Sequence, residues 1–152
     1  MAIVDVYAYE QMAGDPDDHR PNTTWALVTD PETPDGQYVA GLSLLFERCA
    51  VGDKIPLHTH DIDEVIIIDD GEAEVRVGDE VRTVSAGAVV FVTASMPHGT
   101  KNIGNQIVQL HAVFPSPRIG ITYLERNPAP GTEQDAPQPF AVFDARSAQP
   151  DN

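Results

Sequence analysis

One stretch of the sequence, residues 52–71, places three side chains that can bind a metal within seven positions. His58 and His60 are two residues apart, and in a β-strand such residues point to the same face of the sheet. Glu64 has the same parity, so a strand, straight or with a short kink, would return it to that face. Two imidazoles and one carboxylate that converge on a point form a ligand set for a divalent transition metal, with positions left for water or substrate.

The rest of the chain has the pattern of an all-β protein. From residue 37 onward, short β-prone segments are separated by turn-forming clusters, and almost no helical period is present. Residues 72–77 alternate, so that Ala73, Val75 and Val77 share one face and three charged residues share the other. Regular short strands of this kind predict an antiparallel sandwich or barrel.

Several strands are predicted outside that central region as well. We expect an opening strand within residues 3–9 and a long strand over residues 37–49, either continuous or broken near Gly41, on which Leu44 and Phe46 share a face. After residue 115, repeated prolines interrupt regular sheet, although residues 119–124 could still form a strand or an edge. Residues 139–143 are an apolar island that docks on the barrel or on a neighbouring subunit.

Two motifs in this order resemble those of the cupin superfamily. The first has Gly52, His58, His60, Glu64 and Gly71, with five, one, three and six residues between them. The second opens at Gly87 and contains His98 and Asn102. Thr93 and Ser95 stand at turn positions of this second motif where the family usually has Pro and Gly.

The cupin resemblance implies a double-stranded β-helix, the jelly-roll barrel, in which His98 joins the three residues of the first motif. We expect one domain over residues 1–152. It would consist of a barrel core of about residues 37–115, an N-terminal strand extension (1–36) and a Pro-rich C-terminal tail (116–152).

The predicted metal ligands are His58, His60, Glu64 and His98. Three imidazoles and one carboxylate suit Fe, Mn, Ni, Zn, Cu or Co as divalent ions, and the sequence does not choose among them. In octahedral coordination two adjacent positions stay open, for a bidentate substrate or for substrate plus dioxygen. The family resemblance implies that Glu64 could also accept a proton.

Other pocket residues follow only from parity. Ile66 and Ile68 share the parity of the first-motif ligands and are candidates for an apolar wall. Within residues 106–114, Gln109 and His111 share one face, opposite a wholly apolar one. We predict His111 as a general base or substrate contact if that face points inward, and as a solvated residue if it points outward. Arg118 could hold an anionic group of a substrate or be a surface charge, and the role of Tyr123 is open in the same way.

Composition restricts the partners. The chain has 24 acidic and 9 basic residues and a formal net charge of −15, which argues against binding to nucleic acid or to an anionic membrane surface. The one cysteine, Cys49, excludes an internal disulfide and is expected to be a buried thiol. No apolar run is long enough for a transmembrane helix and no secretory signal is visible, so we expect a cytoplasmic protein.

These features favour a metal-dependent enzyme that acts on a small molecule. The resemblance implies a dioxygenase acting on an enolisable or phenolic substrate, slightly preferred, or a redox-neutral isomerase, cyclase or lyase. A non-catalytic sensor or binding module and a storage-type cupin are the alternatives, and the intact ligand set favours the enzyme. The resemblance also implies a homodimer, with the island around Phe140 as a candidate contact.

Overall fold

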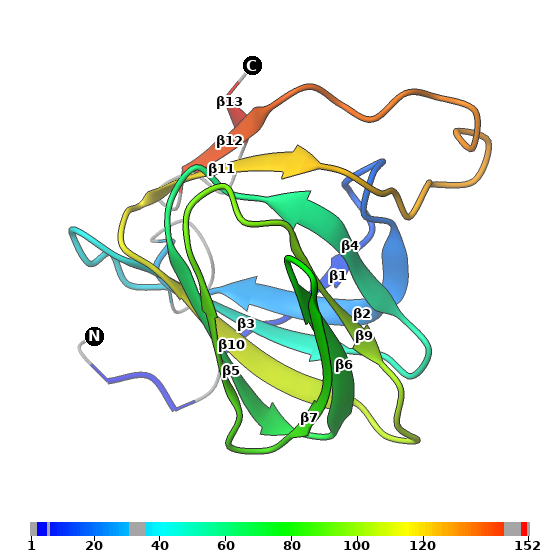
Figure 1. The fold of residues 1–152 in the computed structure, drawn as a ribbon. Coiled ribbons are helices and arrows are strands. Elements are labelled where there is room, and N and C mark those ends of the chain that lie inside the picture. Colours follow the sequence, from blue (N-terminus) through cyan, green and yellow to red (C-terminus); the bar gives the residue numbers. More distant parts are fainter. Residues whose placement is uncertain (1–2, 6, 31–35, 145–149, 152) are drawn as a thin grey trace.

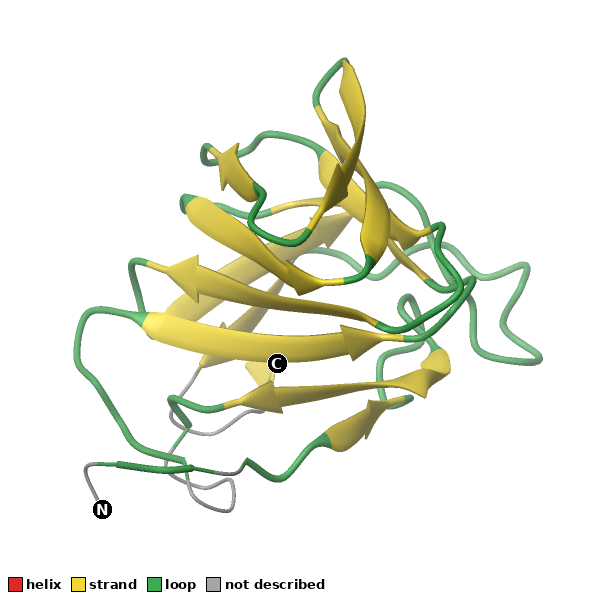
Figure 2. Ribbon diagram, turned by 90° about the horizontal axis from the view of Figure 1, so that it is seen from below, coloured by secondary structure: helices red, strands yellow, loops and turns green. Residues whose placement is uncertain are grey.

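The computed structural model describes residues 3–5, 7–30, 36–144 and 150–151, and these form two antiparallel sheets that face each other (Figures 1 and 2). In spatial order, the first sheet contains β1 (Glu10–Met12), β2 (Arg20–Leu27), β3 (Ser43–Cys49), β10 (Val108–Phe114), β5 (Glu64–Asp70) and β8 (Val89–Val92). The second contains β13 (Pro150–Asp151), β12 (Ala141–Asp144), β11 (Arg118–Tyr123), β4 (Lys54–Thr59), β9 (His98–Asn102), β6 (Glu72–Val77) and β7 (Glu80–Ser85). The predicted all-β jelly-roll class is confirmed. The described residues contain no helix, and so none that could cross a membrane.

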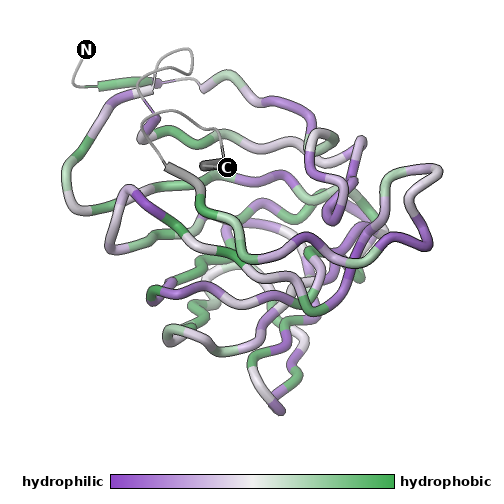
Figure 3. Tube along the Cα trace, turned by 90° about the horizontal axis from the view of Figure 1, so that it is seen from above, coloured by the Kyte–Doolittle hydropathy of each residue, from purple (hydrophilic) through white to green (hydrophobic). Residues whose placement is uncertain are grey.

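The core lies between the two sheets and is built by alternation along the strands, which is visible as changing colour along the chain in Figure 3. On β10 the whole predicted apolar face, from Val108 to Phe114, is at most 3% exposed. Ala73 and Val75 on β6 point into the same core, as expected. β10 and β6 thus bury every second side chain against the opposite sheet.

The three framing glycines of the two motifs have a conformational role. Gly52, Gly71 and Gly87 all have φ between 81° and 93°, in the left-handed region that glycine enters without steric cost. At Gly71 a side chain would also meet the Ile107 carbonyl oxygen at 2.8 Å. Ser95, which stands where the family usually has Gly, has φ of 67° and is the one non-glycine residue with positive φ in the described part of the chain.

One strand prediction is wrong and another is narrowed. Residues 3–5 and 7–9 are not strand, and the first strand is β1. The strand predicted over residues 37–49 is interrupted near Gly41, the position where a break was expected: Gly41, with φ of 90°, makes a turn, and β3 follows it. On β3 Leu44 and Phe46 share a face, as predicted; it is the outer face, and the buried face carries Glu47 and Cys49.

The C-terminal region also contains more sheet than we expected from its many prolines. Residues 119–124 were a possible strand, and β11 forms there and pairs with β4. Part of the apolar island becomes β12, which pairs with β11. The prolines lie in the connections between these strands or at a strand end, where a missing N–H group does little harm.

Candidate metal centre

Two neighbouring strands and one facing strand bring the four predicted ligands together. His58 lies on β4 directly opposite His98, the first residue of β9. His60 follows the end of β4, and Glu64 is the first residue of β5 in the other sheet. The chain therefore crosses from one sheet to the other between His60 and Glu64, rather than returning Glu64 along the same strand.

The four side chains form a compact, buried cluster. Their exposed fractions are 2–7%, and one ligand atom from each lies within 4.8 Å of the others. The Nε2 atoms of His58 and His60 are 3.1 Å apart. Glu64 Oε2 is 2.8 Å from His98 Nε2 and 3.3 Å from His60 Nε2. Among the described residues, this is the one such group of histidine, cysteine and acidic side chains.

The Nδ1 atom of each imidazole makes a hydrogen bond on the side away from the cluster. His58 Nδ1–H donates to the Pro56 carbonyl at 2.7 Å, and His98 Nδ1–H to the Met96 carbonyl at 2.9 Å. His60 Nδ1–H donates to the carbonyl of Gly120 on β11 at 2.8 Å. With the proton fixed on Nδ1, a neutral ring presents the lone pair of Nε2 to the cluster, as a metal ligand must.

Electrostatics keep the His58 ring neutral and the Glu64 carboxylate charged. Burial, together with the neighbouring His98 and His60, lowers the pKa of His58 to about 3. Burial alone would raise the pKa of Glu64, but its contacts with His60 and His98 lower it to about 2. At neutral pH the cluster therefore holds an ionised carboxylate and at least one imidazole that carries no positive charge.

The unpaired atoms of this cluster fit a cation. Glu64 Oε2 and His98 Nε2 are buried and without a hydrogen-bond partner, although they lie 2.8 Å apart. With the His98 proton on Nδ1, both atoms are acceptors, so only a second proton or a cation between them satisfies the pair. Three imidazole nitrogens and one carboxylate oxygen are donors for a divalent transition metal, so the residues fit the implied metal.

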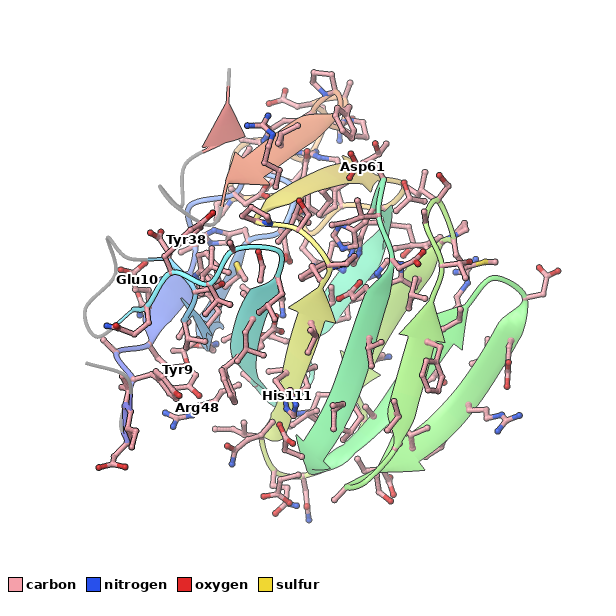
Figure 4. All side chains as sticks on the ribbon, turned by 90° about the vertical axis from the view of Figure 1, so that its left-hand side faces the viewer. Tyr9, Glu10, Tyr38, Arg48, Asp61 and His111 are labelled. Carbon is pink, nitrogen blue, oxygen red and sulfur yellow. The ribbon has the colours of Figure 1, made fainter. Side chains whose placement is uncertain are left out.

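The other predicted pocket residues do not join the cluster. His111 and Gln109 lie on the outer face of β10; His111 Nδ1 is 2.7 Å from Asp69 Oδ2 (Figure 4). The prediction that His111 acts inside the barrel is wrong, because strict alternation on β10 points its apolar face inward. Arg118 is exposed at the start of β11.

The two apolar candidates lie in the core, and Tyr123 lies beside His58. Ile66 and Ile68 are buried in the core, at most 4% exposed. Tyr123 stands opposite His58 across the β11–β4 pairing, with ring centroids 6.1 Å apart, and its hydroxyl donates to Asp15 at 2.8 Å. The edge-on contact of Phe114 with His60 adds an aromatic wall.

Comparison with known proteins agrees with this geometry. Residues 45–114, which hold all four ligands, match the family model of the cupin domain. Residues 45–114 are a cupin domain. No curated protein sequence matches the chain.

Solved structures share the fold at low sequence identity. The polyketide cyclase RemF from Streptomyces resistomycificus has a TM-score of 0.62 at 21% identity, over 84% of this chain and 82% of that one. A sugar phosphate isomerase from Silicibacter pomeroyi has 0.58 at 16% identity, over 81% and 71%. An oxalate decarboxylase from Lactobacillus farciminis has 0.61 at 19% identity, over 72% of this chain and 33% of that chain.

A buried ionic network that links β2 to β3 was not predicted. Arg20 on β2 contacts both oxygens of Asp18 at 2.7 and 2.8 Å and Glu47 Oε1 at 2.5 Å, and all three residues are at most 5% exposed. Burial raises the pKa of Glu47, the charge of Arg20 opposes that rise, and the charges of Asp18 and Glu64 add to it. Glu47 thus lies close enough to the four clustered side chains for the charge of Glu64 to change its pKa.

Cys49 adjoins the same network. It is fully buried, as predicted, and its sulfur is 3.9 Å from Arg20 Nη1. Burial and the charge of Glu47 raise the pKa of the thiol to about 12. A thiol that stays protonated at neutral pH is a poor nucleophile, which favours a structural role.

The Arg20 network predicts a large loss of stability when its one cation is removed. Arg20→Met should lower the free energy of unfolding by about 3–5 kcal/mol, because Asp18 and Glu47 would be left buried without a counter-charge. Urea unfolding, followed by circular dichroism, measures the loss. Arg82→Met is the matched control: Arg82 pairs with Glu80 on the surface, with both side chains at least 60% exposed, and should cost less than about 1 kcal/mol. Equal losses in the two variants would contradict this account.

Proposed function

We propose that this cupin domain is a metal-dependent enzyme that acts on a small molecule. The observation that carries the proposal is the buried cluster of His58, His60, Glu64 and His98. Every Nδ1–H in it donates to a backbone carbonyl, and the Nε2 atoms of His60 and His98 lie within 3.3 Å of the carboxylate. A buried arrangement with unsatisfied acceptors costs stability, and such costs are typical of sites kept for chemistry.

The three Nε2 atoms and the Glu64 carboxylate would hold one divalent ion of Fe, Mn, Ni, Zn, Cu or Co. A metal bound there supplies a Lewis acid that polarises a substrate oxygen and stabilises negative charge on it. Four protein ligands are fewer than the six of octahedral coordination, so substrate atoms could be admitted.

For the reaction we propose a redox-neutral conversion of an enolisable carbonyl substrate: a cyclisation, isomerisation or lyase step. The names of three structural neighbours, a polyketide cyclase, a sugar phosphate isomerase and an oxalate decarboxylase, support this class over the dioxygenase. Because their identities are below 25%, they support it as analogy. The dioxygenase stays the second candidate, since the same four ligands also suit iron.

In this proposal, different residues orient the rings, exclude water and bind the metal. The carbonyls of Pro56, Met96 and Gly120 orient the three rings, and Phe114 against His60 helps to exclude water. Glu64, with a pKa of about 2, is ionised at neutral pH and serves as a ligand. The proton transfer by Glu64 that the family resemblance implies stays a prediction.

The reaction class is tested with protein loaded separately with Fe(II), Mn(II), Ni(II) and Zn(II). Each form is incubated with a panel of β-dicarbonyl compounds and phenols, with and without dioxygen. We expect turnover that does not need dioxygen and that is lost in His58→Ala. Oxygen consumption in proportion to product would instead support the dioxygenase, and saturable ligand binding without turnover would support the binding module.

We also propose that the protein forms a homodimer, through the outer face of β3, β10, β5 and β8 (Figure 4). An outer sheet face that meets water is normally polar. Here two cross-strand rows are apolar or aromatic: Leu44, Val113, Val65 and Phe91, and next to them Phe46, His111, Ile67 and Val89. Phe91 is 74% exposed and Val89 47%. The ring of Tyr7 stacks on Phe46, so the exposed apolar surface is centred on Phe91 and Val89. An exposed apolar patch of this kind is typical of an interaction site.

Charge favours a second copy as the partner on this face. The chain has a net charge of −15, so most of its surface would repel an identical molecule. The two rows contain one titratable residue, His111, and it is paired with Asp69. A two-fold axis parallel to the strands would place the large Phe91 of each copy opposite the smaller Leu44 of the other.

The dimer face is tested by sedimentation velocity over a range of protein concentrations. Phe91→Glu should shift the protein from dimer to monomer, because it places a buried charge at the interface. Val81→Glu, a matched change at a 55% exposed valine on β7, should leave the dimer intact. A wild-type protein that is monomeric at every concentration would contradict the proposal. Dissociation by Phe140→Glu alone would move the contact to the C-terminal island.

A cytoplasmic location stays a prediction from composition.

A further inference from the structure

One metal ligand depends on a strand outside the matched domain. The family match ends at residue 114, and β11 begins at Arg118. His58 and His98 donate their Nδ1 protons to carbonyls two residues earlier in their own segments. His60 instead donates to Gly120, sixty residues away. The orientation of the His60 ring is therefore set by the C-terminal strands and not by its own strand.

Directly after the end of β4, side-chain hydrogen bonds take the place of backbone pairing with β11. β11 pairs with β4 at Tyr123 and Thr122, and β4 ends at Thr59. Beyond that end, side chains continue the contact with β11: His60 Nδ1–H donates to the Gly120 carbonyl, and the Gly120 N–H donates to Asp61 Oδ1, both at 2.8 Å. Figure 4 shows Asp61 beside β11. Two consecutive side chains thus hold both backbone groups of Gly120.

Space explains why a glycine occupies this position. Gly120 is buried, and a Cβ atom there would lie 2.4 Å from Phe140 Cζ and 2.5 Å from Asp61 Oδ1. Both distances are far shorter than a van der Waals contact. The Phe140 ring therefore covers Gly120 from the segment before β12, and β12 itself pairs with β11 beside it. Any larger residue would push away either the ring or the carboxylate that holds Gly120 in place.

We propose that Gly120 is a positioning residue for the metal centre, held by Asp61 and Phe140, and that β11 and β12 are consequently part of the site. The inference rests on the proposed metal-dependent function. Gly120 fixes the proton on Nδ1 of His60 and aims its Nε2 at the cluster. Hydrogen-bond partners behind metal-binding histidines commonly contribute 10–100-fold to metal affinity. Displacement of Gly120 should therefore weaken metal binding without removal of any ligand.

The direct test is Gly120→Ala, titrated with Co²⁺, whose visible absorption reports ligation, in competition with a chelator. We expect about 10–100-fold weaker binding than in the wild type. Gly104→Ala is the matched control, because a Cβ atom there would make ordinary contacts of 3.5–3.7 Å. It should bind Co²⁺ as the wild type does. The double variant Gly120→Ala/Phe140→Ala should recover part of the affinity, since it removes the ring that the new Cβ would strike.

Asp61→Ala keeps the proposal testable if Gly120→Ala does not fold. Asp61 is exposed, so its loss should be tolerated, yet it removes the acceptor for the Gly120 N–H and should also weaken Co²⁺ binding. Wild-type affinity in folded Gly120→Ala, or in Asp61→Ala where Gly120→Ala fails to fold, would overturn the proposal.

A measurement without metal separates this proposal from the proposed function. ¹H–¹⁵N spectra of the imidazoles should show the His60 proton on Nδ1 in the wild type and a loss of that preference in Gly120→Ala, or in Asp61→Ala if that variant takes its place. If the wild type binds no Co²⁺, the metal-dependent function fails, while these spectra still decide whether Gly120 positions His60. A His60 ring with the same proton distribution in both proteins would overturn the positioning role.

Discussion

The candidate metal centre depends on three hydrogen bonds made on the far side of its histidine rings. Each Nδ1–H is committed to a backbone carbonyl, of Pro56, Gly120 or Met96. These bonds fix both the tautomer and the direction of each ring. They leave the Nε2 lone pairs facing the ionised Glu64 in a space from which water is largely excluded, where an unpaired acceptor is costly. A bound cation removes that cost, so the protein's stability and its affinity for metal are linked.

The barrel is what makes such a cluster possible. His58 and His98 meet because β4 and β9 are paired, and Glu64 reaches them because the chain crosses to the facing sheet after His60. The same closure buries the Arg20–Glu47 pair on the inner side of the first sheet. Two sets of buried charge therefore share one core. The charge of Glu64 already raises the pKa of Glu47, so a metal bound at the first set would also change the second.

The sequence predicted the four clustered residues because their signal is local and repeated. A spacing of two places His58 and His60 on one face, and the cupin resemblance added His98 from a second motif. Alternation alone also predicted the buried face of β10. It left the facing of Gln109 and His111 open, and the structure places both on the outer face, so the predicted role of His111 inside the barrel was wrong.

Other features had no local signal. Glu47 interrupts an apolar pattern on β3, and its burial makes sense only with Arg20, which is 27 residues away. The Gly120 carbonyl is paired with a side chain 60 residues earlier, and no spacing rule connects them. The C-terminal strands were obscured by prolines that lie between strands or at their ends. Long-range pairing of this kind requires the fold before it can be recognised.

The most direct test of the central claim is the metal content of protein purified without chelators, measured by elemental analysis for the wild type, His58→Ala and His19→Ala. His19 serves as the control because it lies outside the cluster, with its ring near the Ala13 carbonyl. The account predicts close to one divalent transition metal ion per chain in the wild type and in His19→Ala, and little in His58→Ala. Equal metal content in all three proteins, or a wild type that binds none of the six candidate ions when they are added, would contradict it.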